Sequence, residues 1–436
     1  MTDSVLASAE VVTRSEAFQA RLKRRYAAER RFRFYGQAAI WFSFFFLVVL
    51  FTTIIGRGWS SFLQSSMTLD IDFASSVIDP DGKRDSATLL QADYQKLARD
   101  ALFKNLGIQD NDRAGRKAAG ALLSRGVDVQ LRDLVMADPS IIGQTKPVAI
   151  LASGNVDSLL KGAIDRNVPE ASRQLTDQQI TWIDTLRSSG VLGLHFNWGM
   201  FTYGASSQPE TAGLAVALVG SLFMMLTVLL LAVPIGVAGA IYLEEFAPKN
   251  RWTDIIEVNI NNLAAVPSIV FGLLGLAIFI NTIGLPRSAS LVGGLVLSLM
   301  TLPTIIIATR AAITAVPPSI REAALGVGAS KMQTIFHHVL PLAVPGILTG
   351  TIIGLVRALG ETAPLLMIGM VAFIVNPPTT PLQPATALPI QIYMWATSAE
   401  RGFYERTAGA TIVLLLFSFV MNAAAIYLRR KFERRW

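Results

Sequence analysis

Two residues of opposite charge lie inside one of the most apolar stretches of the chain. Arg357 and Glu361 stand four residues apart, so on a helix they share one face. A charge in mid-bilayer costs about 2.5–3.5 kcal/mol on insertion scales, so such residues usually face a cavity or a partner. The guanidinium fork of Arg357 matches two oxygens of an oxyanion, and Thr362 adds a hydroxyl. The alternative is a mutual ion pair that only fixes helix packing.

A helix, a glycine-rich bend and a second helix are predicted between two apolar runs. Ser319 and Glu322 have the spacing of a capping box, in which the serine hydroxyl accepts from the glutamate N–H and the carboxylate reaches back. The short helix should end near Gly328, and a second capping box at Ser330 and Gln333 opens the next helix. Small residues on the first helix permit close approach by another protein. They are Ala323, Ala324, Gly326 and Gly328.

These residues need membrane helices to position them. The chain is 52% hydrophobic and 16% charged, which is too few charges for a soluble domain. Crossing a bilayer takes about 20 apolar residues as a helix. Six such runs lie at 37–56, 212–243, 257–281, 290–312, 342–374 and 407–428. The predicted fold class is therefore an all-α, polytopic membrane protein with about six transmembrane helices.

The two longest runs exceed the thickness of a bilayer. We expect the runs at 212–243 and 342–374 to tilt, to break at Pro234 or Pro364, or to continue into water. The run at 37–56 is an anchor and not a signal peptide, because its apolar core is too long and no small-residue cleavage site follows it.

The formal net charge of +7 is concentrated at the two ends, beside apolar runs. That is the positive-inside pattern, so with an even number of spans we expect both termini in the cytoplasm, near membrane lipid and not nucleic acid. The predicted parts are a basic tail (1–35), an anchor (36–56), an extracytoplasmic domain (57–207), a transmembrane core (208–428) and a basic tail (429–436).

The extracytoplasmic segment is soluble in composition. Ser86–Leu106 and Thr176–Leu186 space their apolar residues at helical intervals, which predicts a mainly helical domain. It is either a docking surface for a partner or a stabilising insertion. His195 is interpreted as a surface or packing residue, and His337 and His338 as surface or interface residues. The chain has no cysteine. We expect no metal and no cofactor.

Several stretches resemble one family. Glu322-Ala323-Ala324, Gly328 and Leu340-Pro341 stand at the spacing of the EAA loop of bacterial ABC importer membrane subunits, although His338 replaces the usual Ile. Ile241–Phe246, Val266–Gly272 and Arg357–Pro364 resemble phosphate-specific permeases of the PstA type, over about 209–436. The segment before this region is an extension that the shortest members lack.

The resemblance implies a permease subunit of a phosphate importer in the cytoplasmic (inner) membrane. Its partners would be a homologous second permease subunit of the PstC type, two ATP-binding subunits of the PstB type and an extracytoplasmic phosphate-binding protein. The EAA loop would contact the ATPase, through Ser319, Glu322, Ala323, Ala324, Gly328, Leu340 and Pro341. The chain has no phosphate-binding loop of the Gly-x4-Gly-Lys-Ser/Thr type, so it is not the ATPase and not an enzyme on its own.

Phosphate near neutral pH keeps a proton that Glu361 can accept in a hydrogen bond, whereas sulfate has none to offer. Three alternatives stay open. The first is an ABC permease for another oxyanion, molybdate or sulfate. The second is an ion-coupled secondary transporter that uses Arg357 and Glu361 as a relay. The third is a membrane sensor, which would need a cytoplasmic signalling domain.

Overall fold

The computed structural model describes residues 16–432, so residues 1–15 and 433–436 of the two predicted basic tails lie outside it. Helix α2 (Glu16–Gly58) contains the whole predicted anchor. The described residues up to Arg57 form one unit, and those from Gly58 onward form another. The side chains from Trp41 to Phe46 on α2 are exposed, which suits a helix surrounded by lipid.

The second unit begins with a three-stranded antiparallel sheet of order β2-β1-β3. The strands are β1 (Leu63–Asp72), β2 (Thr145–Leu151) and β3 (Leu192–Phe196). In β1, Met67, Leu69 and Ile71 are buried and alternate with exposed polar residues, which is the pattern of a strand with one face on a core. We call residues 63–196 the sheet domain.

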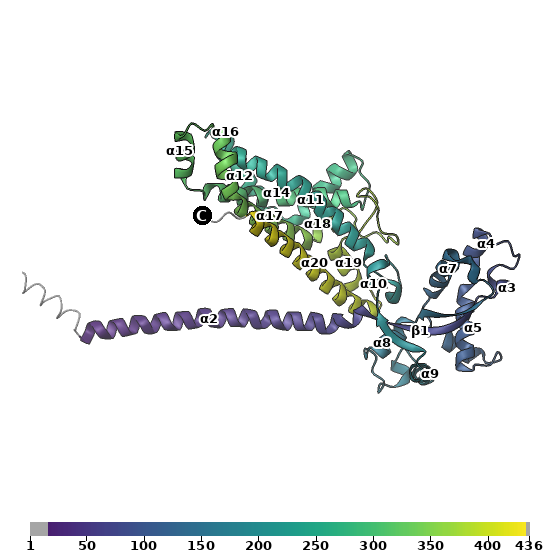
Figure 1. Ribbon diagram of the computed structural model, residues 1–436. Helices are drawn as coiled ribbons and strands as arrows, with labels where there is room; N and C mark the ends of the chain where they lie inside the picture. The colour runs from purple at the N-terminus through teal and green to yellow at the C-terminus, as the bar shows by residue number, and fades with distance from the viewer. Residues whose placement is uncertain (1–15, 433–436) are drawn as a thin grey trace, which may run out of the picture. The chain divides into compact units, whose positions relative to one another are not determined.

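Short helices cover the sheet (Figure 1). Both predicted helical stretches are confirmed: the first is split at Ala92, and the second begins with a capping box of Thr176 and Gln179. The helices are α3 (Ser75–Ile78), α4 (Ser86–Gln91), α5 (Tyr94–Leu106), α6 (Arg113–Gly120), α7 (Val127–Ala137), α8 (Gly154–Leu160) and α9 (Asp177–Ser188). The sheet itself was not predicted.

From residue 197 to residue 432 the chain is mainly helical (Figure 1). The helices α11 (Ala215–Ile241), α14 (Ser290–Thr314), α17 (Leu340–Gly360) and α20 (Gly402–Phe432) pack side by side. The other helical segments are α10 (Gly199–Thr202), η4 (Pro209–Thr211), η5 (Tyr242–Phe246), α12 (Arg251–Ala264), α13 (Ser268–Gly275), η6 (Leu276–Thr282), α15 (Pro318–Gly326), α16 (Lys331–Gln333), η7 (Thr334–Val339), α18 (Ala363–Met367) and α19 (Leu388–Ala396).

Among residues 16–432, five helices are long and apolar enough to cross a membrane, or six if one bent pair counts as a span. The fold class is thus confirmed as mostly helical and membrane-spanning, with the sheet as an addition. The bent pair is the run predicted at 257–281, where α12 and α13 meet at 102°. Pro267 explains the break, because the residue before a proline disfavours the helical conformation.

Neither of the two long runs breaks at its proline. Pro234 lies inside an unbroken α11, so a break there is wrong. The run at 342–374 does break, but at Glu361, whose backbone is extended, and not at Pro364. Helix α17 therefore stops at Gly360, and the short α18 follows.

Small residues bring α17 close to α14. A Cβ atom added to Gly346 would lie 2.6 Å from Ala312 Cβ, and one added to Gly350 would overlap Ala308 Cβ. The glycines allow this approach because they have no side chain, as the small-residue spacing in membrane helices indicates.

Buried charges join the sheet domain to the start of α20. Lys161 Nζ lies 2.6 Å from Asp157 Oδ2 and 2.9 Å from Glu405 Oε1. The carboxyl of Glu210 accepts from Ser124 Oγ at 2.8 Å, and the guanidinium of Arg406 is buried nearby. The sheet domain is thus attached to the membrane core by paired charges as well as by the chain.

Candidate functional site

The loop between α14 and α17 forms the predicted helix, bend and helix, with one correction. The capping box at Ser319 and Glu322 is wrong: α15 starts at Pro318 after Pro317, and no side chain caps it. Proline at the first helical position is preorganised for a helix and has no N–H to satisfy, so Ser319 falls inside the first turn.

The bend and the second cap follow the prediction. Gly328 has a φ of +88°, and its N–H bonds to Leu325 O at 3.0 Å. This left-handed conformation ends α15 at low cost only for glycine. Ser330 and Gln333 make the second capping box. The helix that begins there passes through Leu340 and Pro341 and continues as α17.

The C-terminal end of α15 is apolar and exposed in this chain. Ala324 is buried, but Glu322 and Ala323 are exposed. Leu325 is 52% exposed and Val327 is 86% exposed. An apolar helix end at a helix bend, held in a fixed conformation, has the features of a protein contact site.

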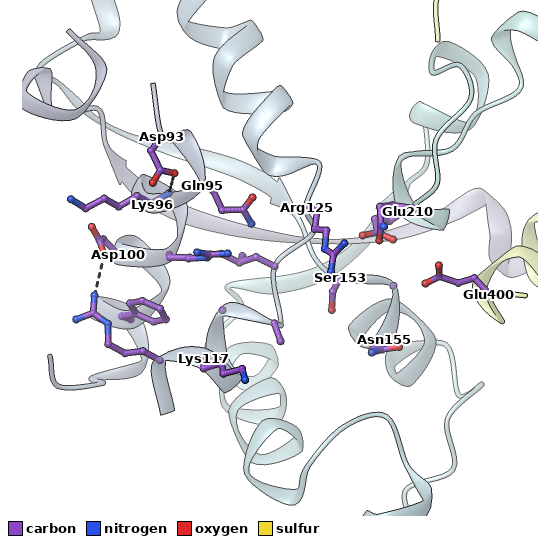
Figure 2. Close-up of a pocket in the computed structure, with 18 residues that line it drawn as sticks. Asp93, Gln95, Lys96, Asp100, Lys117, Arg125, Ser153, Asn155, Glu210 and Glu400 are labelled. Atoms are coloured by element: carbon purple, nitrogen blue, oxygen red, sulfur yellow. Dashed lines mark hydrogen bonds and ion pairs between the residues drawn. The ribbon is translucent and has the colours of Figure 1, made fainter. Parts of the chain in front are cut away.

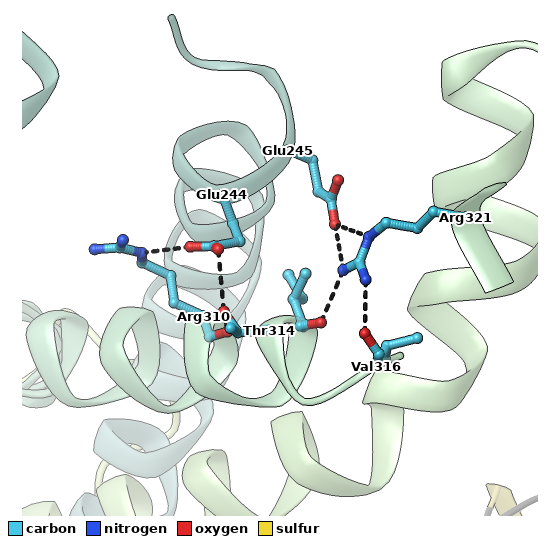
Figure 3. A network of polar contacts seen from close by, with 7 residues as sticks. Glu244, Glu245, Arg310, Thr314, Val316 and Arg321 are labelled. Atoms are coloured by element: carbon cyan, nitrogen blue, oxygen red, sulfur yellow. Dashed lines mark hydrogen bonds and ion pairs between the residues drawn. The ribbon is translucent and has the colours of Figure 1, made fainter. Parts of the chain in front are cut away.

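One arginine holds α15 on the membrane core (Figure 3). Arg321 Nε and Nη2 donate to Glu245 Oε1 at 3.1 and 2.8 Å. Its Nη1 donates to Val316 O at 2.7 Å and its Nη2 to Ile313 O at 2.9 Å. The guanidinium therefore ties α15 to the end of α14 and to η5, which follows α11.

The neighbouring glutamate has a different partner (Figure 3). Glu244 Oε2 accepts from Arg310 Nε at 3.1 Å, and its Oε1 accepts from Thr314 Oγ1 at 3.0 Å. Arg310 Nη1 also lies 2.9 Å from Glu257 Oε1 on α12. The wide π turn of η5 thus presents two adjacent glutamates to two different arginines.

Sequence reasoning missed this pair of interactions. It quoted Glu244 and Glu245 only for a resemblance and gave no role to Arg310 or Arg321. The signal was present, because Arg310 lies within an apolar run and a charge there needs a partner.

The structure brings Arg357 and Glu361 together at the end of α17. Arg357 lies in the last turn, and Glu361 is the first residue past the helix, so they do not share one continuous helical face. Arg357 Nε is 3.7 Å from Glu361 Oε1, and their side chains are 51% and 21% exposed. Thr362 opens α18, and its hydroxyl has no hydrogen-bond partner in the described part of the chain.

The comparisons with known proteins identify the core. Residues 232–436 match the family model of the binding-protein-dependent transport system inner membrane component. A probable ABC transporter permease, YqgI of Bacillus subtilis, is 32% identical over 253 residues, which cover 55% of this chain and 85% of that protein. The chain belongs to the binding-protein-dependent ABC transporter permeases.

Two further relatives have phosphate in their names. The phosphate transport system permease PstA 1 of Mycobacterium tuberculosis is 33% identical to this permease, covering 55% of this chain and 77% of that protein. PstA of Haemophilus influenzae is 29% identical to this permease, and the match covers 59% of this chain and 88% of that protein. A solved MetNI methionine ABC transporter covers 51% of the permease and 98% of that chain, with 16% identity and a TM-score of 0.42.

An N-terminal segment of the permease matches a family without an assigned role. Residues 19–170 match a domain of unknown function, DUF3333. The permease is thus a multi-pass inner membrane protein, the non-catalytic membrane component of an ABC importer, with an N-terminal extension.

Proposed function

We propose that this permease is one membrane subunit of an ATP-driven importer of inorganic phosphate. The observation that carries the proposal is the similarity to PstA permeases over 77–88% of their length. Arg357, Glu361 and Thr362 supply the chemistry: a half-exposed guanidinium, a carboxylate 3.7 Å from it and a free hydroxyl at the end of α17. An arginine fork binds phosphate oxygens in a bidentate manner, and the carboxylate accepts a hydrogen bond from the phosphate O–H.

The loop from Ser319 to Pro341 is proposed to contact the ATP-binding subunits. Its exposed apolar end needs a protein cover, and Arg321 couples it to α11 and α14. The wider assembly would contain a homologous second permease subunit, two ATP-binding subunits and an extracytoplasmic phosphate-binding protein. ATP-driven movement of α15 would tilt the helices around Arg357 and expose it to each side in turn.

We propose that both termini and α15 face the cytoplasm and that the sheet domain faces outside. Helix α11 begins just after Glu210, whose backbone O accepts from Gln64 of the sheet domain, and it leads into η5, whose Glu245 holds Arg321. Its 27 residues rise about 40 Å at 1.5 Å each, which is enough to cross a bilayer.

The test is reconstitution of the complete importer in liposomes. Phosphate uptake should require ATP, the ATPase subunits and the binding protein. ATP-dependent uptake of molybdate or sulfate without phosphate uptake would assign the other oxyanion instead. Uptake by the permease alone, driven by an ion gradient, would show that it is a secondary transporter.

A further inference from the structure

A cavity of about 960 Å³ opens between the sheet domain and the start of the membrane core (Figure 2). Its walls come from α5, α6, the turn that follows α6, and the start of α8. Glu210 and Glu400 lie at the opposite end, and Gln208 also lines the cavity. A cavity of this size is at the upper end of the range for small-molecule sites.

Four positive side chains of this cavity have no partner among the described residues. Lys96 and Arg99 come from α5, Lys117 from α6 and Arg125 from the following turn. None of them has an ion pair or a side-chain hydrogen bond within residues 16–432. By contrast, Arg116 in the same wall pairs with Asp100 at 3.3 Å and with Asp110, and it lies 4.6 Å from the centre of the Phe103 ring.

Neutral donors accompany these cations. The side chains of Gln95 and Asn155 make no hydrogen bond to other described residues. Ser153 Oγ is buried and has no partner there either. This hydroxyl is therefore free to donate to a water or to a bound ligand.

Most acids of the cavity are already engaged. Asp93 accepts from the backbone N–H of Lys96 at 2.9 Å, and Asp100 pairs with Arg116. Glu210 accepts from Ser124 Oγ, and burial raises the pKa of its carboxyl above the usual range. Glu400 is the acid of the lining whose carboxylate has no partner among residues 16–432, so one free carboxylate stands against four free cations. The charge that remains available to a ligand is therefore positive.

We propose that this cavity binds a phosphate-type oxyanion, either free or as the phosphate group of a larger solute. Arginine and lysine with amide and hydroxyl donors are the groups that recognise phosphate oxygens. The volume exceeds what one inorganic phosphate fills, so a phosphate ester also fits. The site is separate from Arg357 and stands whether or not the transported anion is phosphate.

The test is anion binding to the full-length permease in its complex, in nanodiscs of neutral lipid and without the binding protein. An Arg357→Gln background removes the proposed membrane site, so the remaining binding reports the cavity. Inorganic phosphate, glycerol phosphate and sulfate are titrated by calorimetry. The double change Arg99→Gln with Lys117→Gln should weaken binding of inorganic phosphate, glycerol phosphate or both at least tenfold.

Lys104→Gln with Arg113→Gln is the matched control. Both residues are exposed cations on the same two helices, α5 and α6, and lie outside the cavity lining. The control should bind within twofold of the parent, and thermal unfolding checks that each variant is folded. If the first double variant does not fold, Lys96→Gln on the exposed face of α5 takes its place.

Tighter binding of glycerol phosphate would identify a larger solute, and tighter binding of inorganic phosphate would identify the free anion. Either result supports the site. An equal loss in the control pair, equal or tighter binding of sulfate, or no phosphate binding at all would overturn it.

Discussion

Most N–H donors of the Arg357 guanidinium make no hydrogen bond in the described chain. Its one ionic contact in the described chain is the 3.7 Å approach of Nε to Glu361, which is too long for a good hydrogen bond, and half of its side chain is exposed. A tightly made structural ion pair would use the planar fork of the guanidinium on both carboxylate oxygens. The loose geometry leaves the fork free for a ligand or for the second subunit.

If the fork binds the anion, Arg357→Lys should fail in phosphate uptake although it keeps the charge, and Arg357→Gln should fail more completely. A loss of about 1.4 kcal/mol of binding corresponds to tenfold in affinity. Glu361→Gln should reduce phosphate uptake less, because the glutamine amide oxygen can still accept a hydrogen bond from phosphate. Its main effect should be weaker discrimination against sulfate. Uptake of labelled phosphate and sulfate, with assembly checked by co-purification, measures these effects.

The double change Arg357→Gln with Glu361→Gln separates the two interpretations. A purely structural pair predicts that either single change strands a charge and lowers assembly, while the double change restores assembly and uptake. Recovery of phosphate uptake in the double variant is the result that excludes an anion site at Arg357.

Glu210 makes stability depend on pH. Burial raises the pKa of its carboxyl, against the opposing effects of Ser124 and Arg406, while Glu400 adds to the rise. The folded protein therefore holds this proton more tightly than the unfolded chain, so the free energy of unfolding decreases as pH rises above about 4.5. In Glu210→Gln, the melting temperature should fall less between pH 4.5 and 7 than in the parent. An unchanged difference would show that Glu210 titrates normally.

At the scale of elements, α15 depends on a glycine that sequence and structure both single out. Gly328 has a φ of +88°, a conformation that asparagine tolerates better than most other residues, and no atom lies within 4 Å of an added Cβ. Both Gly328→Asp and Gly328→Asn therefore fit this chain, and they differ in charge at nearly equal size.

We expect Gly328→Asp to insert normally but to lose the ATPase subunits or transport, because it places a charge in the proposed contact. Gly328→Asn should retain more ATPase binding and more transport than Gly328→Asp. Co-purification of the ATPase and phosphate uptake are the measurements. If both variants behave like the parent, this loop is not the contact.

The sequence predicted those elements whose signals are local. The runs that became α11 and α14, the bend at Gly328 and the cap at Ser330 follow from apolar length and from residue chemistry near one position. The bonds of Arg321 to Glu245 could not be predicted in this way, because 76 residues separate the two and a π turn sets the direction of the glutamate.

The other misses have the same origin. Ser319 matched a capping pattern, but the prolines before it had already fixed the start of the helix. The sheet was missed although Met67, Leu69 and Ile71 alternate with polar residues, because the helical periodicity of the longer segments dominated the interpretation. The cavity lining likewise joins residues from 93 to 400, which no local pattern relates.

At the scale of the whole molecule, the arrangement across the membrane is testable because the chain has no cysteine. A cysteine at Ser86 or Ser172, in the sheet domain, should react with an impermeant thiol reagent in cells whose outer layer is permeabilised. A cysteine at Val327, which is 86% exposed, should react only after the inner membrane is opened. The reverse labelling pattern would invert the proposed topology.

The contacts of Arg321 also decide how movement travels through the permease. If the loop were joined to its helices by flexible chain alone, the loop could move without moving the helices. Here the planar guanidinium of Arg321 hydrogen-bonds to Glu245, Val316 and Ile313 at once, so the connection is rigid in more than one direction. A displacement of α15 in any direction would therefore move the ends of α11 and α14 together.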